Sequence, residues 1–306
     1  MSLLTVFKKP VGPSGFGFAS TALEVTEGLN LTGKTILITG VNTGLGRETA
    51  RVLALRGAKI YGTVRSDEKA LKVQEELGPL VHPILCDLSE PSSISDAVGV
   101  LREFNSPIDA IICNAGVMAL PICNQKHGIE LQFLTNHLGH FNLVTKALDL
   151  LTETGRVVMV SSRAHTNPYA QGIQFDNLEG TLEYSRWRAY GQSKLANLLF
   201  ARELATRMPH SSQSAFAVHP GVIKTELVRH FNPLVRLGAS LGGALFFKSV
   251  EQGAATQCYV AVHPGVSNLN GEYFFDNNVK ESSDMGRDMD MAKRLWETSM
   301  AFIEKF

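Results

Sequence analysis

The chain has 306 residues, of which 44% are hydrophobic, and its 29 Lys and Arg residues balance its 29 Asp and Glu residues. A formal charge of zero gives no electrostatic preference for nucleic acid or for an anionic membrane, so no nucleic-acid partner is expected. A chain of this length can bury a full core without disulfides or metal, which favours one large domain.

The cysteines form neither a CxxC pair nor a spacing with histidine that would hold zinc, so we expect no metal site. They are typical of reduced core thiols, which favours a cytoplasmic location. The residues are Cys86, Cys113, Cys123 and Cys258.

Two stretches of the chain were candidates for a targeting or membrane segment, and neither fits. Residues 1–20 carry Lys8 and Lys9 among prolines and glycines, which is typical of a loose arm and not of a signal peptide. The most apolar later stretch, 234–247, contains Arg236 and is too short to span a bilayer as a helix. We therefore expect no transmembrane anchor.

Apolar runs of strand length alternate with stretches of helical periodicity, a pattern typical of a parallel sheet covered on both faces. The fold class predicted is α/β, a doubly wound, mostly parallel seven-stranded sheet in a single domain. An arm (1–30) would precede the main domain (31–306), in which the apolar insertion 227–250 would form a small substrate cap. The predicted strands are 35–39, 59–63, 81–85, 110–113, 156–160, 215–218 and 273–275, and the predicted helices include 48–56, 94–104, 131–151 and 189–208.

A glycine-rich turn of spacing GxxxGxG follows the first predicted strand and opens a helical run. Glycines there allow backbone to approach a pyrophosphate, and the helix amino terminus offers N–H groups to it. Taken alone, the same turn could be a tight connection. The residues assigned to the dinucleotide are Gly40, Thr43, Gly44, Leu45 and Gly46.

Val64 and Arg65 stand at the end of the second strand, where NAD-preferring enzymes usually place an acidic residue. A guanidinium can bind a ribose 2′-phosphate through several donors, whereas a carboxylate would repel it. The sequence thus predicts NADP(H) over NAD(H); the alternative is that Arg65 is an ordinary solvated side chain.

Polar or glycine-rich turns also follow the third, fourth and sixth strands, at the edge where ligands bind in such sheets. Each could be a plain turn if taken alone. The further cofactor residues predicted from them are Asp87, Leu88, Asn114, Ala115, Gly116, Pro220, Gly221, Ile223 and Thr225.

Tyr190 and Lys194 are four residues apart in a predicted helix, so they share one helix face. A tyrosine phenol has a pKa of ~10, and lowering this pKa to about 7 requires roughly 4 kcal/mol of stabilisation of the ionised form. A neighbouring ammonium and an oxidised nicotinamide can provide it. Ser162, after the fifth strand, could donate to a substrate carbonyl, and Asn136 could hold a water beside Lys194.

The order TGxxxGxG, DL, NAG, Asn, Ser, YxxxK and PGxxxT over residues 31–275 resembles the short-chain dehydrogenase/reductase family, whose fold is of the Rossmann type. The resemblance implies that Tyr190 is the acid–base, that Lys194 binds the nicotinamide ribose and lowers the tyrosine pKa, that Ser162 orients the carbonyl and that Asn136 supports a water relay. Residues 64–65, 188–197 and 219–227 look like the retinol dehydrogenase branch. Residues 14–17, 24–28 and 51–57 are similar to plant dehydrogenases associated with chloroplast protein import.

The sequence thus predicts an NADP(H)-dependent oxidoreductase that interconverts a carbonyl and an alcohol on a small lipophilic substrate. Two alternatives stay open: an NADPH-binding sensor or scaffold without turnover, and an epimerase or dehydratase on the same fold. Homo-oligomers could form if the helices bearing Asn136 and Tyr190 paired with copies of themselves.

Overall fold

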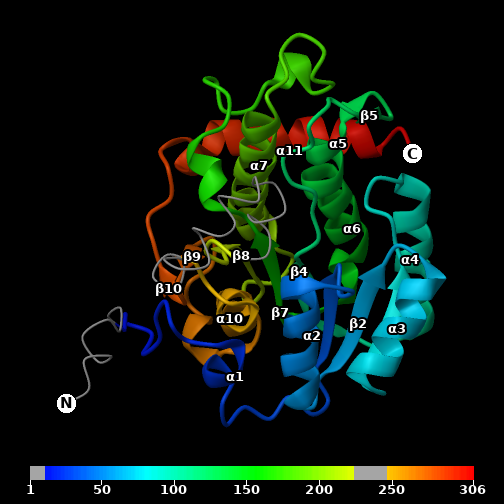
Figure 1. The fold of residues 1–306 in the computed structure, drawn as a ribbon, viewed down its shortest axis with the longest axis vertical. Helices are drawn as coiled ribbons and strands as arrows, with labels where there is room; N and C mark the ends of the chain where they lie inside the picture. The colour runs from blue at the N-terminus through cyan, green and yellow to red at the C-terminus, as the bar shows by residue number, and fades with distance from the viewer. Residues whose placement is uncertain (1–10, 224–246) are drawn as a thin grey trace, which may run out of the picture.

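The computed structural model describes residues 11–223 and 247–306, and an eight-stranded sheet runs through this part (Figure 1). The strand order is β10-β9-β8-β7-β4-β1-β2-β3, with β10 antiparallel to β9 and every other neighbouring pair parallel. All seven predicted strands are present, which confirms the doubly wound sheet; the short β10 was not predicted. The strands are β1 (Thr35–Thr39), β2 (Lys59–Val64), β3 (Val81–Leu85), β4 (Ile108–Cys113), β7 (Leu151–Val160), β8 (Ser214–His219), β9 (Tyr273–Phe275) and β10 (Asn278–Val279), with β5 (Gln125–Lys126) and β6 (Ile129–Glu130) in a separate hairpin.

Helices cover both faces of the sheet. The helix predicted over 131–151 is interrupted: its turn Leu134–Leu138 is π-helical, and its last residue already belongs to β7. The helices are α1 (Ala22–Val25), α2 (Gly44–Leu55), α3 (Asp67–Leu77), α4 (Pro91–Glu103), α5 (Leu131–Phe133), α6 (Gly139–Ala147), α7 (Arg186–Arg207), α10 (Val250–Val262) and α11 (Met289–Ile303).

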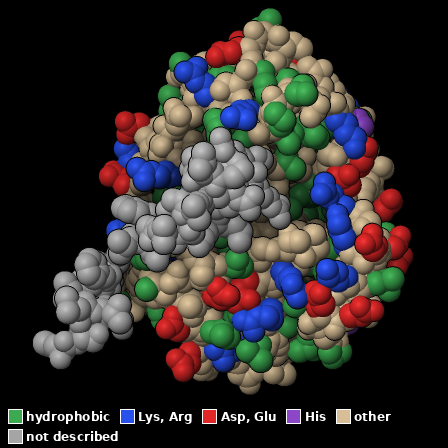
Figure 2. All heavy atoms as spheres, viewed as in Figure 1, with side chains coloured by type: hydrophobic (Ala, Val, Ile, Leu, Met, Phe, Trp, Pro, Cys, Tyr) green, Lys and Arg blue, Asp and Glu red, His purple; other side chains and the backbone are tan. Residues whose placement is uncertain are grey.

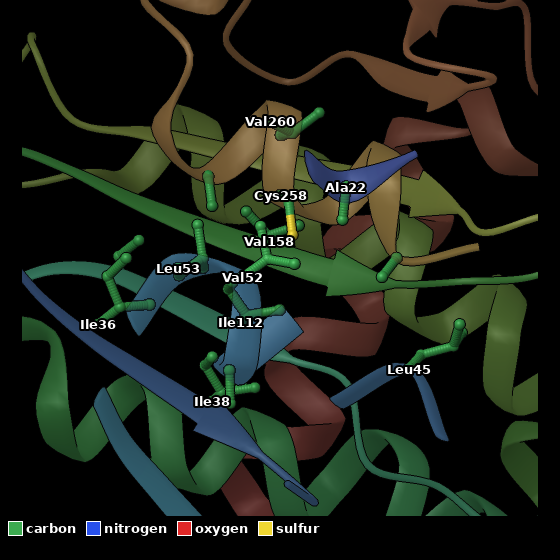
Figure 3. Close-up of a cluster of buried hydrophobic side chains, with 14 of the residues drawn as sticks. Ala22, Ile36, Ile38, Leu45, Val52, Leu53, Ile112, Val158, Cys258 and Val260 are labelled. Carbon is green, nitrogen blue, oxygen red and sulfur yellow. The ribbon is translucent and has the colours of Figure 1, made fainter. Parts of the chain in front are cut away.

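The strands are apolar on both sides, and alternate residues join two different cores. Ile36 and Ile38 of β1 pack with α2 and α10, whereas Leu37 between them packs with α4, α6 and α7 on the other face. Figure 3 shows the first cluster, in which Val52 and Leu53 of α2 lie over the strands. Burial on both faces fixes the register of the strands and hence the alignment of their carboxyl ends.

Helix α11 runs across α7 (Figure 1), and one of its side chains also contacts α6. The ring of Trp296 lies 5.1 Å from that of Phe141 in α6 and 5.8 Å from that of Phe200 in α7. This face of α6 and α7 is therefore covered within the same chain.

Residues 11–20 are not the loose arm that their composition predicts. Ser14 N donates to Asn278 Oδ1 at 3.0 Å, Asn278 Nδ2 donates to Phe16 O at 3.0 Å, and the Phe16 ring packs edge-on against Tyr259 of α10. Composition misled the prediction because glycine and proline here shape turns that hydrogen-bond to a distant part of the chain. The segment therefore packs against α10.

The predicted cap, 227–250, lies outside the described residues except for 247–250, and so does Thr225. The described flanks meet: Ile223 and Lys248 pair in a parallel bridge. Lys248 is fully buried, with Nζ 2.6 Å from Asp276 Oδ1 and 5.3 Å from the Phe18 ring centroid. Both flanks are thus anchored beside the sheet.

Within residues 11–223 and 247–306, no helix combines the length and the hydropathy that a bilayer crossing requires.

Candidate functional site

The glycine turn after β1 lies against the turn after β4. Gly40 has a φ of +74°, and a Cβ there would lie 2.9 Å from Cβ of Ala115. A Cβ on Gly46 would come 2.3 Å from the carbonyl oxygen of Gly40, so glycine is required at both places. Thr43 and Gly44 at the start of α2 are exposed, which leaves the helix amino terminus open to a ligand.

Thr39, the last residue of β1, holds the two turns together. Its Oγ1 accepts hydrogen bonds from the backbone N–H groups of Asn114 and Ala115, both at 2.9 Å. The Asn114 side chain returns a bond to the Thr39 carbonyl at 2.9 Å. The Asn114 amide therefore fixes the spacing of β1 and β4.

Arg65 and Asp87 lie at the adjoining edge of the sheet, and Arg65 is exposed. Burial alone would raise the pKa of Asp87, but hydrogen bonds from Ser89 and the charges of Lys126 and Arg65 leave it lowered. The carboxylate is therefore ionised, and Ser89 holds it by hydrogen bonds from its backbone N and its hydroxyl. The side chain of Leu88 is buried against Gly139, where an added Cβ would lie 2.8 Å from Leu88 Cβ.

The turn after β8 lies next to the glycine turn after β1, at the carboxyl ends of the strands. A Cβ on Gly253 of α10 would lie 2.3 Å from Ile223 Cδ1 and 2.7 Å from Leu45 Cδ2, so this glycine lets the two side chains meet. The first glycine turn and the turn of Pro220 and Gly221 are thereby brought together. Gly221 N donates to the buried His219 at 3.3 Å, which fixes the turn.

Asn136 and Lys194 meet beside Gly116. Asn136 is fully buried, accepts from Val117 N at 2.8 Å and donates to Ser193 Oγ at 2.9 Å. A Cβ on Gly116 would lie 2.9 Å from Asn136 Oδ1 and 3.6 Å from Lys194 Nζ. The fourth-strand turn therefore reaches the catalytic candidates only because residue 116 lacks a side chain.

Lys194 holds its ammonium at the end of β7, next to the half-buried Tyr190 of the same helix. Its Nζ donates to the Val160 carbonyl at 2.9 Å and lies 5.7 Å from the centroid of the Tyr190 ring. Ser193 Oγ donates to the Tyr190 carbonyl at 2.8 Å, which links the start of α7 to Asn136. Tyr190 and Lys194 thus share one face of α7, and Ser193 of the same helix binds the Asn136 amide.

The two serines after β7 have different surroundings. Ser161 is buried and donates to the Lys194 carbonyl at 2.7 Å, so its hydroxyl is already used. Ser162 accepts from Ala164 N at 3.2 Å and can still donate its proton. Its loop reaches α7 because Gly191 lacks a side chain: a Cβ there would lie 2.7 Å from the Ala164 carbonyl oxygen.

Figure 2 shows this face of the molecule hollowed next to the segment drawn in grey, with hydrophobic side chains inside the hollow and Lys and Arg side chains along its rim. A cationic rim suits a phosphate-bearing ligand. Among the residues that the structure describes, no group of three or more His, Cys, Asp or Glu side chains could hold a metal ion.

The family model for short chain dehydrogenases matches residues 34–234. The chain belongs to the short-chain dehydrogenase family. Members of this family are oxidoreductases that use a nicotinamide cofactor.

The similarity to individual members of the family extends over nearly the whole chain. Short-chain dehydrogenase TIC 32 A, chloroplastic, of Brassica napus is 39% identical, with 96% of each chain covered. Retinol dehydrogenase 12 of Homo sapiens is 40% identical over 90% of this chain and 88% of its own. The resemblance to both branches noted in the sequence is thereby confirmed.

Solved structures agree on the fold. A crystal structure of a protein from Mycobacterium Paratuberculosis is 32% identical and superposes with a TM-score of 0.74, covering 92% of this chain and 97% of its own. A blue fluorescent protein from a metagenomic library, solved in complex with NADPH, is 22% identical with a TM-score of 0.63, covering 80% of this chain and 96% of its own.

Sequence reasoning missed four groups that hold the predicted residues: Thr39, Ser193 and the backbones of Val117 and Val160. A polar residue at the last position of a buried strand was the available signal for Thr39, since such a hydroxyl needs a partner. Backbone carbonyls carry no such signal, because every residue has one.

Proposed function

We propose that this chain is an NADP(H)-dependent oxidoreductase that interconverts a carbonyl and an alcohol on a small lipophilic substrate. The observation that carries the proposal is the position of Lys194 Nζ. It lies 5.7 Å from the centroid of the Tyr190 ring and would lie 3.6 Å from a Cβ added to Gly116 in the turn after β4. An ammonium at the meeting point of a cofactor turn and a phenol is what hydride transfer with a tyrosine acid–base requires.

The glycine cradle fits a dinucleotide. Because Gly40, Gly46 and Gly116 lack side chains, the turns after β1 and β4 and the Asn136 amide pack closely against one another. Thr43 and Gly44 at the start of α2 stay exposed to a ligand. The pyrophosphate would rest on the turn from Gly40 to Gly46 and the open start of α2, and the nicotinamide ribose would bind Lys194. When bound, the nicotinamide supplies or accepts the hydride.

In the reduction, Tyr190 would give its proton to the carbonyl oxygen, and Ser162 would donate a hydrogen bond to that oxygen. The charge of Lys194 would favour the ionised form of the Tyr190 phenol. Asn136 would hold Val117 and Ser193 in place by its hydrogen bonds to them. Oxidation runs the same proton transfer backwards.

Replacing Tyr190 by Phe tests the mechanism, because it removes the acid–base group and little else. We expect kcat to fall by about 10²- to 10⁴-fold with NADPH binding retained. Tyr61→Phe is the matched control: this buried tyrosine of β2 stacks on Phe104, away from Lys194, and its variant should keep normal turnover. Turnover close to that of the unmodified protein in Tyr190→Phe would remove the mechanism.

The preference for NADP(H) rests on Arg65, whose exposed guanidinium follows the second strand. Arg65→Ala should weaken NADPH binding by about 10-fold or more and leave NADH binding nearly unchanged, as read from nicotinamide fluorescence. Arg102→Ala serves as the control, because it removes an exposed arginine of α4 that pairs with Asp149. Equal use of NADH and NADPH by the unmodified protein would contradict the assignment.

The substrate class rests on the apolar composition of 227–250, whose flanks meet beside the turn after β8. We propose that this segment forms the substrate cap of the domain 31–306, and that Thr225 contacts the cofactor. Assaying NADPH oxidation with aldehydes, ketones and quinones of increasing chain length would identify the substrate. NADPH binding without turnover of any of them would favour a sensor.

The reaction is proposed to take place in the cytoplasm. Four free cysteines, three of them buried, fit a reducing compartment. Imaging of the full-length chain with a carboxyl-terminal tag tests the location. A homo-oligomer would need a surface other than the face of α6 and α7 under α11, and light scattering would reveal its mass.

A further inference from the structure

His140 is a fully buried histidine of α6, one helical turn after Asn136, that the mechanism above does not use. Both ring nitrogens have partners. Nε2 lies 2.8 Å from Oγ1 of Thr39 at the end of β1, and Nδ1 lies 2.8 Å from the carbonyl oxygen of Asn136. The ring therefore spans the gap between the sheet and the π-helical turn.

The partners of Thr39 determine which nitrogen carries the proton. Thr39 Oγ1 already accepts from Asn114 N and Ala115 N, so both of its lone pairs are occupied and its O–H must donate to Nε2. Nδ1 is then protonated and donates to the Asn136 carbonyl. Burial lowers the pKa of His140 to about 4, and the charge of Lys194 adds to the effect although the Asn136 bond opposes it, so the ring stays neutral.

Each end of this bridge belongs to a different half of the site. Thr39 holds the turn that carries Asn114 and Ala115 against the first glycine turn. Asn136 lies in the turn Leu134–Leu138, where Gly139 N donates to the Leu134 carbonyl five residues back, a widened geometry frequent at functional sites. The Asn136 side chain then continues the chain of bonds to Ser193 and the backbone of Tyr190.

We propose that His140 is a positioning residue that couples the dinucleotide-binding turns to the Asn136 carbonyl, and so sets both cofactor affinity and the acid–base behaviour of Tyr190. The inference rests on the proposed function and deepens it. No proton passes through the ring; its role is to hold two backbone segments at a fixed separation.

Two near-isosteric variants separate the two bonds of the ring. In His140→Asn the amide nitrogen takes the place of Nδ1, so donation to Asn136 is kept and the Thr39 contact is lost. In His140→Gln the amide reaches Thr39 and the donation to Asn136 is lost. Comparing the two variants assigns an effect to each end of the bridge.

We expect His140→Asn to weaken NADPH binding by about 5- to 10-fold with the pH profile of kcat unchanged, since one buried hydrogen bond at the cofactor turns is lost. His140→Gln should keep NADPH affinity within about 3-fold, lower kcat by about 10-fold and move the pH profile. Affinity is read from NADPH fluorescence, and the profile from initial rates.

Ser299→Ala is the matched control. It removes the hydroxyl 2.9 Å from Nε2 of His137, the other fully buried histidine of the same helical stretch, on the side of α11. This variant should lower the melting temperature without altering NADPH affinity or the pH profile. If both His140 variants behave in the same way as Ser299→Ala, His140 has only a structural role and the inference is wrong.

Failure of the proposed function would have a different signature. If the unmodified protein binds NADPH but reduces no carbonyl, the proposed reaction is lost, yet the affinities of the two His140 variants still decide the coupling to the cofactor turns. If His140→Asn and the unmodified protein bind NADPH with equal affinity, the proposed coupling of His140 to the cofactor turns is wrong.

Discussion

Gly116 has a backbone conformation open to any residue, so its importance lies in space and not in φ. A Cβ at this position would lie 2.9 Å from Asn136 Oδ1, closer than carbon and oxygen normally approach, and the amide is held by Val117 and Ser193. The Asn136 amide therefore has to move, whereas Lys194 Nζ, 3.6 Å from the added Cβ, lies at an ordinary contact distance. The spacing of the cofactor turn and the acid–base pair depends on this one missing side chain.

Gly116→Ala should accordingly lower kcat by about 10- to 100-fold and cost roughly 1–3 kcal/mol of stability, because the buried Asn136 amide is displaced from its hydrogen bonds to Val117 and Ser193. Steady-state kinetics and urea unfolding measure the two effects.

Gly99→Ala is the control for this change. Gly99 lies in α4, and a Cβ added there would meet no atom within 4 Å, so alanine should stabilise the helix by about 0.5–1 kcal/mol and leave kcat alone. Normal turnover in Gly116→Ala would mean that the turn relaxes without moving its neighbours.

At the level of elements, α11 contacts both α7, which carries Tyr190 and Lys194, and α6, which follows directly after the turn that carries Asn136. Trp296 contacts Phe141 of α6 and Phe200 of α7, and Arg207 stacks on its indole ring 4.7 Å from the centroid. A third helix that packs on both of the others restricts how far they can shift relative to each other. We infer that α11 stabilises the geometry of the site without touching it.

Trp296→Ala should lower the free energy of unfolding by about 2–4 kcal/mol, since a half-buried indole is removed from between two aromatic rings. Urea titration followed by far-UV circular dichroism measures the loss.

Trp187, at the exposed start of α7, provides the matched control among the two tryptophans, and Trp187→Ala should change stability by no more than about 0.5 kcal/mol. An equal loss in the two variants would show that α11 does not brace α6 and α7.

Across the whole molecule, seven strand positions were predictable because these strands are mostly apolar runs that end in a turn signal, whereas the two-residue β10 carries no such pattern. The break within 131–151 was not, since the residues from Leu134 to Leu138 keep a helical pattern in the sequence. Only their backbone hydrogen bonding, in which Gly139 N donates to the Leu134 carbonyl five residues back, distinguishes them. The docking of residues 11–20 was equally hidden, because its partners lie about 260 residues away. Long-range hydrogen bonds to backbone leave no periodic trace in a sequence.

The same buried histidines make the stability of the fold sensitive to acid. Burial lowers the pKa of His137 to about 3, of His140 to about 4 and of His219 to about 3. The neighbouring charges act in the same direction: His140 on His137, Lys194 on His140, and Lys248, His165 and Arg163 on His219. All three rings are neutral in the folded chain at pH 7.

An unfolded chain binds a proton at each of these histidines near pH ~6.5, whereas the folded chain binds them only near pH 4 and below. Their contribution to stability is therefore complete above pH ~6.5 and is lost as the pH falls. Glu130 opposes the trend, because burial raises its pKa.

We expect the free energy of unfolding to fall between pH 6.5 and pH 4.5 by up to about 1.4 kcal/mol per pH unit for each histidine. Urea titrations at pH 7, 6 and 5, followed by tryptophan fluorescence, measure the slope. The slope should persist in about 0.5 M NaCl, because salt screens exposed charges far more than buried ones. A stability that is flat over this range would contradict the prediction. A slope that salt abolishes would place the acid sensitivity on the surface and not in the core around Asn136 and the turn after β8.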